Sequence, residues 1–251
     1  MKNNIIITAG GTSEAIDNVR KITNTGTGKL GCTIANKLLE LKEDEIEKIY
    51  YICSSNAYKP DNPKVEILQI FDTNNLKEQI EDLLKREQIN YFIHSMAVSD
   101  YTVDYVTTAE RMAGYIEENL NNTEKNKENI IRAISENTDV IKDTKISSYE
   151  DNLIIKLKRT PKIISLIKDI NPKIFLVGFK LLDNVSEEDL INVALKLKEK
   201  NNCDLVVAND SKNISDKQHK AFVINDMNNY VEANGKEDIA IKIIEKMFEG
   251  A

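Results

Sequence analysis

Apolar and polar positions along the chain form short blocks that predict strands and helices in alternation. Continuous apolar runs are typical of strands that are buried on both faces. Such runs occur at 5–7, 49–52 and 222–224, and mostly apolar segments that also predict strands occur at 65–68, 91–94, 153–157, 174–180 and 204–208. Apolar residues at three- and four-residue steps are typical of amphipathic helices. They recur at 30–41, 76–84, 186–200 and 236–248.

This alternation predicts an α/β protein with a Rossmann-like three-layer fold, in which helices cover both faces of a mostly parallel central sheet. Ligands in such folds bind outside the carboxyl ends of the strands. The loops that follow 5–7 and 91–94 both occupy that position, so we expect them to converge. Two helix starts are also predicted from capping residues, one at Ser186 with Asp189 and one at Thr160-Pro161.

Residues 108–145 differ in character from the rest of the chain. They are rich in Glu, Asn and Lys, and they contain amphipathic stretches at 112–120 and 130–134 joined by a solvated segment at 121–129. A plain surface insertion and a mobile lid or dimer arm both fit this composition. No repeat or linker divides the sequence, so we expect a single domain over 1–251 that carries this insertion.

Composition and charge exclude several classes of protein. The chain has 251 residues, of which 41% are hydrophobic and 30% charged, with no apolar run long enough to cross a bilayer and no signal peptide. A cytoplasmic protein without a membrane partner is therefore expected. The net charge of −7 argues against nucleic acid as a partner, although a local cationic pocket could still bind a phosphorylated substrate.

Cysteine and histidine give no sign of a metal site. Cys32, Cys53 and Cys203 are widely spaced, and His94 and His219 are the only histidines. No C-x-x-C or other ligand spacing occurs, so any metal ligands stay unassigned.

Glycines follow the first strand in two loops, one at Gly10-Gly11 and one at 24–28. A strand, small residues and a helix start bring backbone N–H groups to phosphates in α/β proteins. Gly26, Gly28 and Gly31 spell G-x-G-x-x-G, the dinucleotide fingerprint, but about fifteen residues separate them from the strand that they should follow directly. A nicotinamide-dependent oxidoreductase therefore stays open as an alternative, and a P-loop is weaker because Leu30 replaces Ser or Thr.

A longer pattern is more specific than any glycine spacing. The stretch ITAGGTSEAIDNVRKITNTGTGKLG (7–31) resembles the opening of phosphopantothenoylcysteine synthetases, the ligases that join 4'-phosphopantothenate to cysteine in coenzyme A biosynthesis. Later elements continue the resemblance in the same order: SMAVSDY (95–101), KISS (145–148), LKRTPKII (157–164), VGFKLL (177–182) and VVANDS (206–211). The resemblance therefore covers most of the chain.

The resemblance implies a reaction in two steps. A carboxylate attacks the α-phosphate of a nucleoside triphosphate to give an acyl-nucleotidylate, and the amine of cysteine then attacks the activated carbonyl. Mg²⁺ is expected to bridge the triphosphate oxygens. Bacterial members use CTP and eukaryotic ones ATP; the Lys-, Asn- and Ile-rich composition suggests an AT-rich bacterial genome and favours CTP. The family also implies a homodimer, and Met1 directly before the first strand suggests a stand-alone ligase without the fused decarboxylase.

The resemblance also assigns roles to single residues. Asn24 is implied to hold the acyl-nucleotidylate, and Lys145 to bind the triphosphate, although Ser147 and Ser148 depart from the family's K-I-K-K form. Arg20 fits either a salt bridge with Asp17 or a contact with substrate phosphate. The expected nucleotide-binding residues are Gly10, Gly11, Lys29, Ala97, Asp100, Phe179, Lys180 and Asn209.

Without the resemblance, each of these residues has an ordinary explanation. Asn24 could be a turn residue, Lys145 a solvated lysine and Phe179 part of the core. A non-catalytic nucleotide-binding protein that kept the loops and lost the chemistry is a further alternative. The presence of both Asn24 and Lys145 speaks against it.

Overall fold

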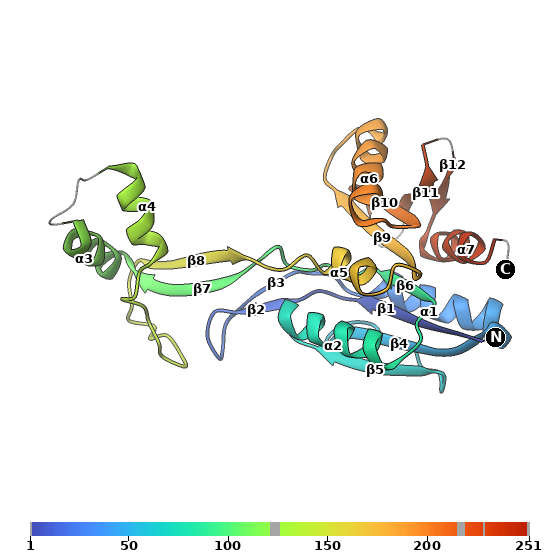
Figure 1. Ribbon diagram of the computed structural model, residues 1–251, viewed down its shortest axis with the longest axis horizontal. Coiled ribbons are helices and arrows are strands. Elements are labelled where there is room, and N and C mark those ends of the chain that lie inside the picture. The colour runs from blue at the N-terminus through green and yellow to red at the C-terminus, as the bar shows by residue number, and fades with distance from the viewer. Residues whose placement is uncertain (1, 121–125, 215–218, 228, 250–251) are drawn as a thin grey trace. The chain divides into compact units, whose positions relative to one another are not determined.

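The computed structural model describes residues 2–120, 126–214, 219–227 and 229–249 (Figure 1). Contacts divide the chain into two compact units. Unit 1 consists of Met1–Thr12, Asn24–Val98 and Pro161–Ala251, and unit 2 of Ser13–Thr23 and Ser99–Thr160. Unit 2 is thus broader than the insertion expected around 108–145. A single functional domain over 1–251 stays a prediction.

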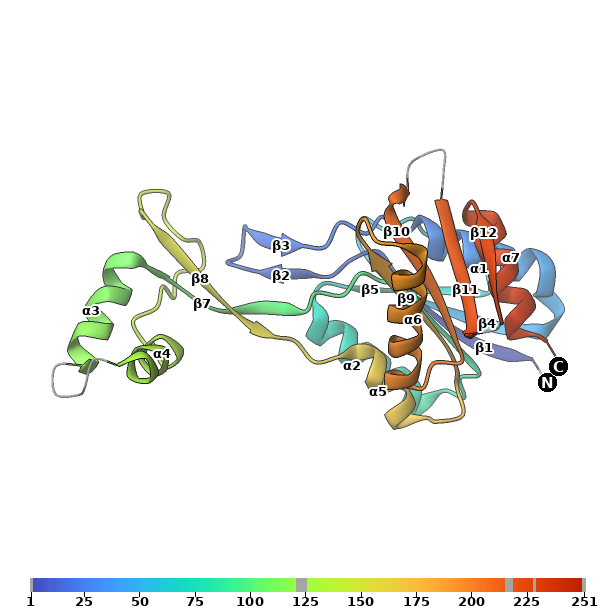
Figure 2. The same ribbon diagram turned by 90° about the horizontal axis from the view of Figure 1, so that it is seen from above.

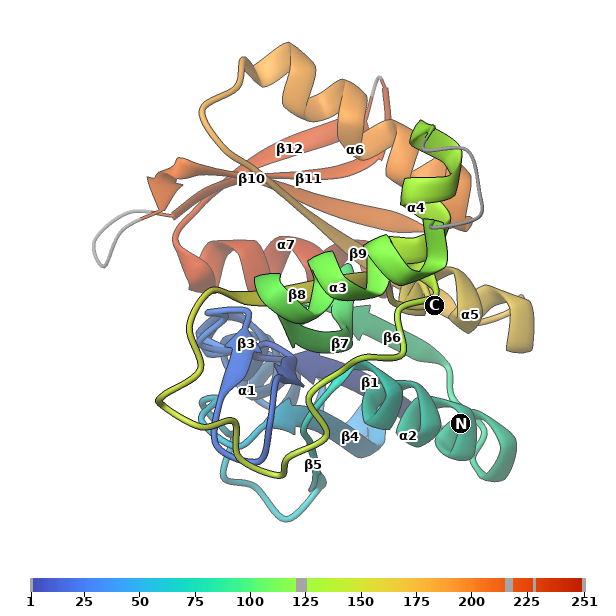
Figure 3. The same cartoon turned by 90° about the vertical axis from the view of Figure 1, so that its left-hand side faces the viewer.

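Unit 1 is built on one eight-stranded sheet with the order β12-β11-β10-β9-β6-β1-β4-β5 (Figure 3). Neighbouring strands from β10 to β5 are parallel, whereas β11 and β12 are antiparallel. The strands are β1 (Asn3–Ala9), β4 (Ile46–Ser54), β5 (Val65–Ile70), β6 (Tyr91–His94), β9 (Phe175–Leu182), β10 (Leu205–Ile214), β11 (His219–Asp226) and β12 (Asn229–Asn234). The mostly parallel sheet predicted from the apolar runs is confirmed.

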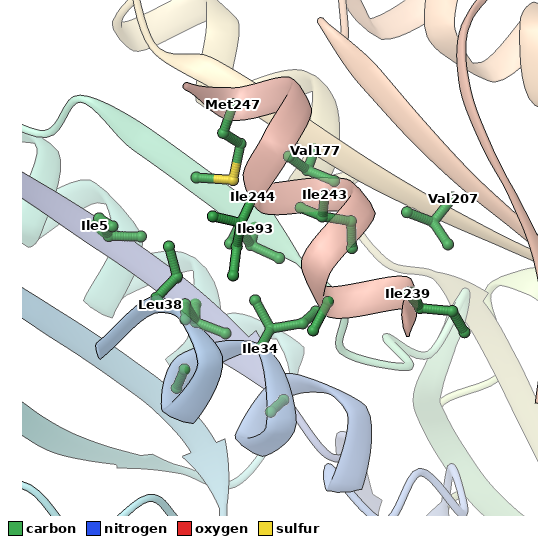
Figure 4. Packing of buried hydrophobic residues seen from close by; sticks show 14 of the residues in the cluster. Ile5, Ile34, Leu38, Ile93, Val177, Val207, Ile239, Ile243, Ile244 and Met247 are labelled. Atoms are coloured by element: carbon green, nitrogen blue, oxygen red, sulfur yellow. The ribbon is translucent and has the colours of Figure 1, made fainter. Parts of the chain in front are cut away.

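Helices cover both faces of this sheet, because its strands are apolar on both sides. On one face, α1 (Lys29–Lys42) and α7 (Lys236–Met247) pack against a cluster that includes Ile5 and Ile7 (Figure 4). On the other face, Ile6 belongs to a second cluster with α2 (Thr73–Arg86), α5 (Ile163–Ile170) and α6 (Glu187–Asn201). The Rossmann-like three-layer fold is therefore confirmed.

The order of the strands reverses beside β1. From β1 the chain proceeds outward to β4 and β5, and it then returns to place β6 on the opposite side of β1. In open α/β sheets, such a reversal leaves a crevice at the carboxyl ends of the two strands. The loops that follow β1 and β6 both lie at this position.

The described residues of unit 2 form two antiparallel ribbons and two helices, which can be followed in Figure 2. The ribbons pair β2 (Ser13–Ala15) with β3 (Lys21–Thr23) and β7 (Tyr101–Thr108) with β8 (Leu153–Arg159). The helices are α3 (Ala109–Leu120) and α4 (Lys127–Ser135), as the amphipathic stretches predicted. Residues 121–125 of the expected solvated segment lie outside the described residues.

One predicted helix start is confirmed and one is wrong. The Ser186 hydroxyl accepts the Asp189 N–H at 3.1 Å and caps α6. In contrast, α5 begins at Ile163, after Lys162. Thr160 lies before this start and bonds within unit 2, where its N–H donates to the Asp100 carbonyl (3.1 Å) and its hydroxyl to the Ser99 carbonyl (2.6 Å).

Two further features complete the fold. A short 3-10 helix, Glu43–Glu45, joins α1 to β4. Among the described residues, no helix is both long and apolar enough to span a bilayer.

Candidate active site

The loops after β1 and β6 are hydrogen-bonded to each other at the strand-order reversal. The Ala97 N–H donates to the Gly10 carbonyl (2.9 Å), and the Thr12 N–H donates to the Ala97 carbonyl (3.1 Å). Gly11 and Ala97 thereby form an isolated parallel bridge that extends the β1–β6 pairing beyond the strands. The predicted convergence of the two loops is confirmed.

Asn24 joins the same group of loops. Its N–H donates to the Thr12 carbonyl at 3.1 Å, and its side-chain Nδ2 donates to the Ala97 carbonyl at 3.3 Å. The second bond ties the amide nitrogen to Ala97, so it favours one orientation of the side chain. The structure thus brings together Gly10, Gly11, Asn24 and Ala97, four of the residues that the sequence singled out.

The glycines of these loops serve close packing. A Cβ on Gly11 would lie 2.1 Å from the Asn24 carbonyl oxygen, and a Cβ on Gly26 would lie 2.5 Å from the Gly10 carbonyl oxygen. Gly28 adopts a φ of 73°, which favours glycine. Gly31 lies within α1, where a Cβ would approach that of Ala9 to 2.8 Å. Chain packing accounts for the G-x-G-x-x-G spacing, which removes the main support for a dinucleotide fingerprint.

Lys29 is the first residue of α1, where cations are disfavoured by the helix dipole. Its Nζ lies 5.1 Å from the centre of the Tyr58 ring, a cation–π contact. The first turn of α1 contains no acidic residue, and its N-cap Gly28 provides no side-chain acceptor. This arrangement places positive charge and backbone N–H donors beside the glycine loops and suits an anionic ligand.

Phe179 and Lys180 lie near the carboxyl end of β9, paired with Val207 and Ala208 of β10. Both side chains are half-buried. Phe179 packs partly against the core on the α1–α7 face, as its ordinary explanation predicted. Their roles in nucleotide binding stay predictions.

Asn209, at the end of the same pair of strands, is buried and bonded to a histidine that the sequence did not single out. Its Nδ2 lies 2.6 Å from His219 Nε2. An amide nitrogen can only donate, so Nε2 accepts and the imidazole proton resides on Nδ1. Burial, followed by the charge of Lys236, lowers the pKa of His219 to about 4. Only the antiparallel pairing of β10 with β11 reveals this contact.

Asp210 follows directly and fixes the loop after β9. Desolvation would raise its pKa, but backbone N–H groups of Val185, Lys212 and Asn184 donate to its carboxylate and lower the pKa to about 2. Lys212 adds an ion pair at 3.3 Å. Asp210 lies in the VVANDS motif (206–211), from which the sequence analysis assigned a role to Asn209 alone.

The remaining predicted residues belong to unit 2. Arg20 forms the salt bridge with Asp17, with Nη2 and Oδ2 2.6 Å apart, so this alternative is seen; a contact with substrate phosphate stays a prediction. Lys145 and Asp100 are exposed. Within the described parts of the chain, no three Asp, Glu, His or Cys side chains gather to hold a metal ion.

His94 is a second histidine with an unexpected environment. It ends β6, is buried, and its Nδ1 lies 2.8 Å from the Thr8 hydroxyl of β1. Burial lowers the pKa of His94 to about 4, so the ring is neutral at pH 7. This bond joins the two strands near their carboxyl ends, where the loops begin.

Comparison with known proteins places the chain in a family. The model of the "DNA/pantothenate metabolism flavoprotein C-terminal domain" matches residues 1–141 and 106–250. The coenzyme A biosynthesis bifunctional protein CoaBC of Thermococcus kodakarensis is 31% identical over 88% of this chain and 44% of its own length. CoaBC of Methanocaldococcus jannaschii is 27% identical over 98% of this chain and 50% of its own length. The chain thus spans about half the length of these curated relatives.

Solved structures agree. A crystal structure of a DNA/pantothenate metabolism flavoprotein from Streptococcus pneumoniae has a TM-score of 0.82 and 37% identity, and the match covers 100% of both chains. A mutant of Cab2 in complex with phosphopantothenate-cysteine has a TM-score of 0.66, covers 98% of this chain and 87% of its own, and at 17% identity shows the shared fold alone. The family that the motifs indicated is confirmed: the chain belongs to the family of the DNA/pantothenate metabolism flavoprotein C-terminal domain.

Proposed function

We propose that the protein is a phosphopantothenate–cysteine ligase that acts through an acyl-nucleotidylate. The observation that carries this proposal is the group of hydrogen-bonded loops at the strand-order reversal, where Asn24 is held by Thr12 and Ala97. These residues belong to the motifs that resemble the ligases, in a chain whose relatives are named for coenzyme A biosynthesis.

The proposed roles follow the chemistry of each step. Asn24 presents its amide to the acyl-nucleotidylate, and the Lys145 ammonium stabilises the negative charge of the triphosphate and the leaving pyrophosphate. Lys29, Lys180 and the helix start at Gly28 add positive potential for the nucleotide. Mg²⁺ usually keeps several waters and binds substrate phosphates with few protein ligands. The proposed Mg²⁺ would therefore be held mainly by the triphosphate, and it needs no cluster of three protein ligands, which the described residues do not form.

CTP rather than ATP is the proposed nucleotide, supported by the composition of the chain. We extend the proposal to a homodimer, as the family resemblance implies. The exposed apolar row Leu153, Ile155 and Leu157 on β8 in unit 2 supports a protein partner, since these side chains are 37%, 38% and 41% exposed. A molar mass from light scattering equal to that of one chain would contradict the dimer.

The experiment is pyrophosphate release by purified protein with 4'-phosphopantothenate and Mg²⁺, with either CTP or ATP, and with or without cysteine. We expect release that depends on phosphopantothenate, one burst per active site without cysteine, and steady turnover with it. Faster release with CTP would support the proposed nucleotide. No release with either nucleotide would refute the ligase.

Variants test the site separately from the function. Asn24→Ala and Lys145→Ala should each lower turnover strongly, by about 10²-fold or more, the scale of losing one fixed electrostatic group. Lys142→Ala is the matched control, because Lys142 is an exposed lysine of the same segment. Equal activity of the Lys145 and Lys142 variants would refute the role of Lys145.

A further inference from the structure

The segment that carries Lys145 has no regular secondary structure, yet its backbone is held on both sides of the lysine. Ile146 is buried, and both of its main-chain groups bond to side chains of the β2–β3 ribbon. Its N–H donates to Asp17 Oδ2 at 3.1 Å, and its carbonyl accepts from Arg20 Nη2 at 2.7 Å. On the other side, the Asn18 N–H donates to the Thr144 carbonyl at 2.9 Å.

Asp17 is the centre of this arrangement. Its Oδ1 accepts the N–H groups of Val19 (2.8 Å) and Arg20 (2.7 Å), which closes the turn between β2 and β3. Its Oδ2 accepts from Arg20 Nε (3.0 Å) and Nη2 (2.6 Å). The Asp17 side chain is 1% exposed. Hydrogen bonding to Arg20 holds the pKa of its carboxyl well below the usual range, against the opposing effect of desolvation.

Arg20 is committed to the same contacts. Three of the guanidinium's five N–H donors are used, two toward Asp17 and one toward the Ile146 carbonyl. An arginine whose only task was to bind substrate phosphate would not need a buried carboxylate and a backbone carbonyl as partners. Together, the contacts of Asp17, Asn18 and Arg20 hold the backbone of residues 144–146 in place.

Lys145 itself is exposed, between the bonded Thr144 carbonyl and the buried Ile146. A lysine on a free loop samples many directions, whereas one on a fixed backbone has only its own side-chain rotations to lose when it binds. Holding the backbone on both sides therefore lowers the entropic cost of placing the ammonium against a ligand.

We propose that Asp17 and Arg20 are positioning residues that act through Lys145, by fixing its backbone for the phosphates of the nucleotide. The inference rests on the proposed ligase function for the identity of the ligand. The hydrogen-bonded pair itself does not depend on that function.

The first test is a double-mutant cycle on pyrophosphate release. Asp17→Asn keeps the side-chain volume and loses the charge, so kcat/KM for the nucleotide should fall by about 10²-fold, the cost of a small misplacement of a reacting group. In a Lys145→Ala background the same change should cost no more than about twofold, because residues that act as a unit are not additive. If the double variant lost kcat/KM by the full product of the two single losses, Asp17 would have a merely structural role and the proposal would be overturned.

Asp104→Asn is the matched control. Asp104 is another ion-paired carboxylate of unit 2, bonded to Lys156 (3.0 Å) and Lys158 (3.1 Å) on β8, and none of its hydrogen bonds or ion pairs involves residues 144–146. Its loss should leave kcat/KM within about twofold of wild type, because an exposed ion pair contributes only ~0–1 kcal/mol to stability and this one does not bond to the segment of Lys145. If Asp17→Asn does not fold, Arg20→Lys takes its place, since it keeps the charge and loses the paired N–H geometry.

The second test needs no activity. Hydrogen exchange at the Ile146 amide should speed up by about tenfold or more in Asp17→Asn relative to Asp104→Asn, because its acceptor is the altered group. Unchanged exchange would overturn the fixing of the backbone. If wild-type protein released no pyrophosphate, the ligase and the role of Lys145 would both fall, while the exchange result would still decide whether the pair fixes this segment.

Discussion

The close packing of the glycine loops makes Gly11→Ala the most informative small change. The added methyl group would lie 2.1 Å from the Asn24 carbonyl oxygen and 2.9 Å from its carbonyl carbon. These are backbone atoms, so no side-chain rotation can relieve the overlap. Asn24 has to move, and with it the two hydrogen bonds that tie it to Thr12 and Ala97.

The size of the effect follows from the overlap. Ordinary carbon–oxygen contacts lie beyond 3.0 Å, so Asn24 must shift by about 1 Å, a typical overpacking defect that costs ~1–3 kcal/mol of the free energy of unfolding. A displacement of that size in a catalytic group lowers turnover by about 10²-fold. A loss of ~1–3 kcal/mol leaves a typical domain folded, so activity should fall by about 10²-fold in protein that is still folded.

Gly114→Ala is the control for this experiment. Gly114 lies within α3, and a Cβ there would meet nothing within 4 Å. The same substitution should raise the free energy of unfolding by ~0.5–1 kcal/mol, because alanine favours a helix over glycine, and leave activity unchanged. Denaturant unfolding and phosphopantothenate-dependent pyrophosphate release measure the two quantities. A Gly11→Ala protein with activity within about twofold of wild type would refute the claim that the placement of Asn24 governs catalysis.

Three further predictions concern titration and packing. His94 and His219 should titrate near pH 4 by NMR, and titration near 6.5 would contradict their burial. Because their pKa values lie below the ordinary 6.5, the free energy of unfolding should fall as the pH drops from about 6.5 to 4, by at most ~1.4 kcal/mol per pH unit for each histidine. Asp210→Asn should lower the unfolding midpoint above pH 4, and its difference from wild type should shrink as the pH falls toward 2. The reason is that the hydrogen bonds that lower the pKa of Asp210 stabilise only its charged form, so a pH-independent difference would exclude this explanation. Leu38→Ala, at a fully buried site between α1 and α7, should cost ~2–5 kcal/mol in urea unfolding, and a cost below about 1 kcal/mol would show that the cavity collapses.

Periodicity was sufficient to predict the layered fold. Runs such as 5–7 and 204–208 are buried on both faces of the sheet, and the helical spacings at 30–41 and 236–248 became α1 and α7. In these elements the apolar residues follow the pattern of a buried strand or of one helix face, so the local sequence determines them. In contrast, β12 was missed because its sequence, NYVEAN, has only one buried side chain and no apolar run.

The sequence could not show which partners the polar residues find. The 153–157 run was predicted as a strand, but only the fold shows that β8 pairs with β7 in unit 2, outside the central sheet. Likewise, Asp17 and Ile146 are 129 residues apart, and their bond depends on the whole of unit 2. The motifs identified Asn24, but the acceptor of its amide, the Ala97 carbonyl, became visible only in the folded chain.

We propose above all that this chain forms an amide between phosphopantothenate and cysteine. Mass spectrometry of a reaction with 4'-phosphopantothenate, cysteine, Mg²⁺ and an equimolar mixture of CTP and ATP tests it most directly. We expect 4'-phosphopantothenoylcysteine together with an equal amount of CMP. Cleaved nucleotide without the cysteine adduct, or no product at all, would contradict it.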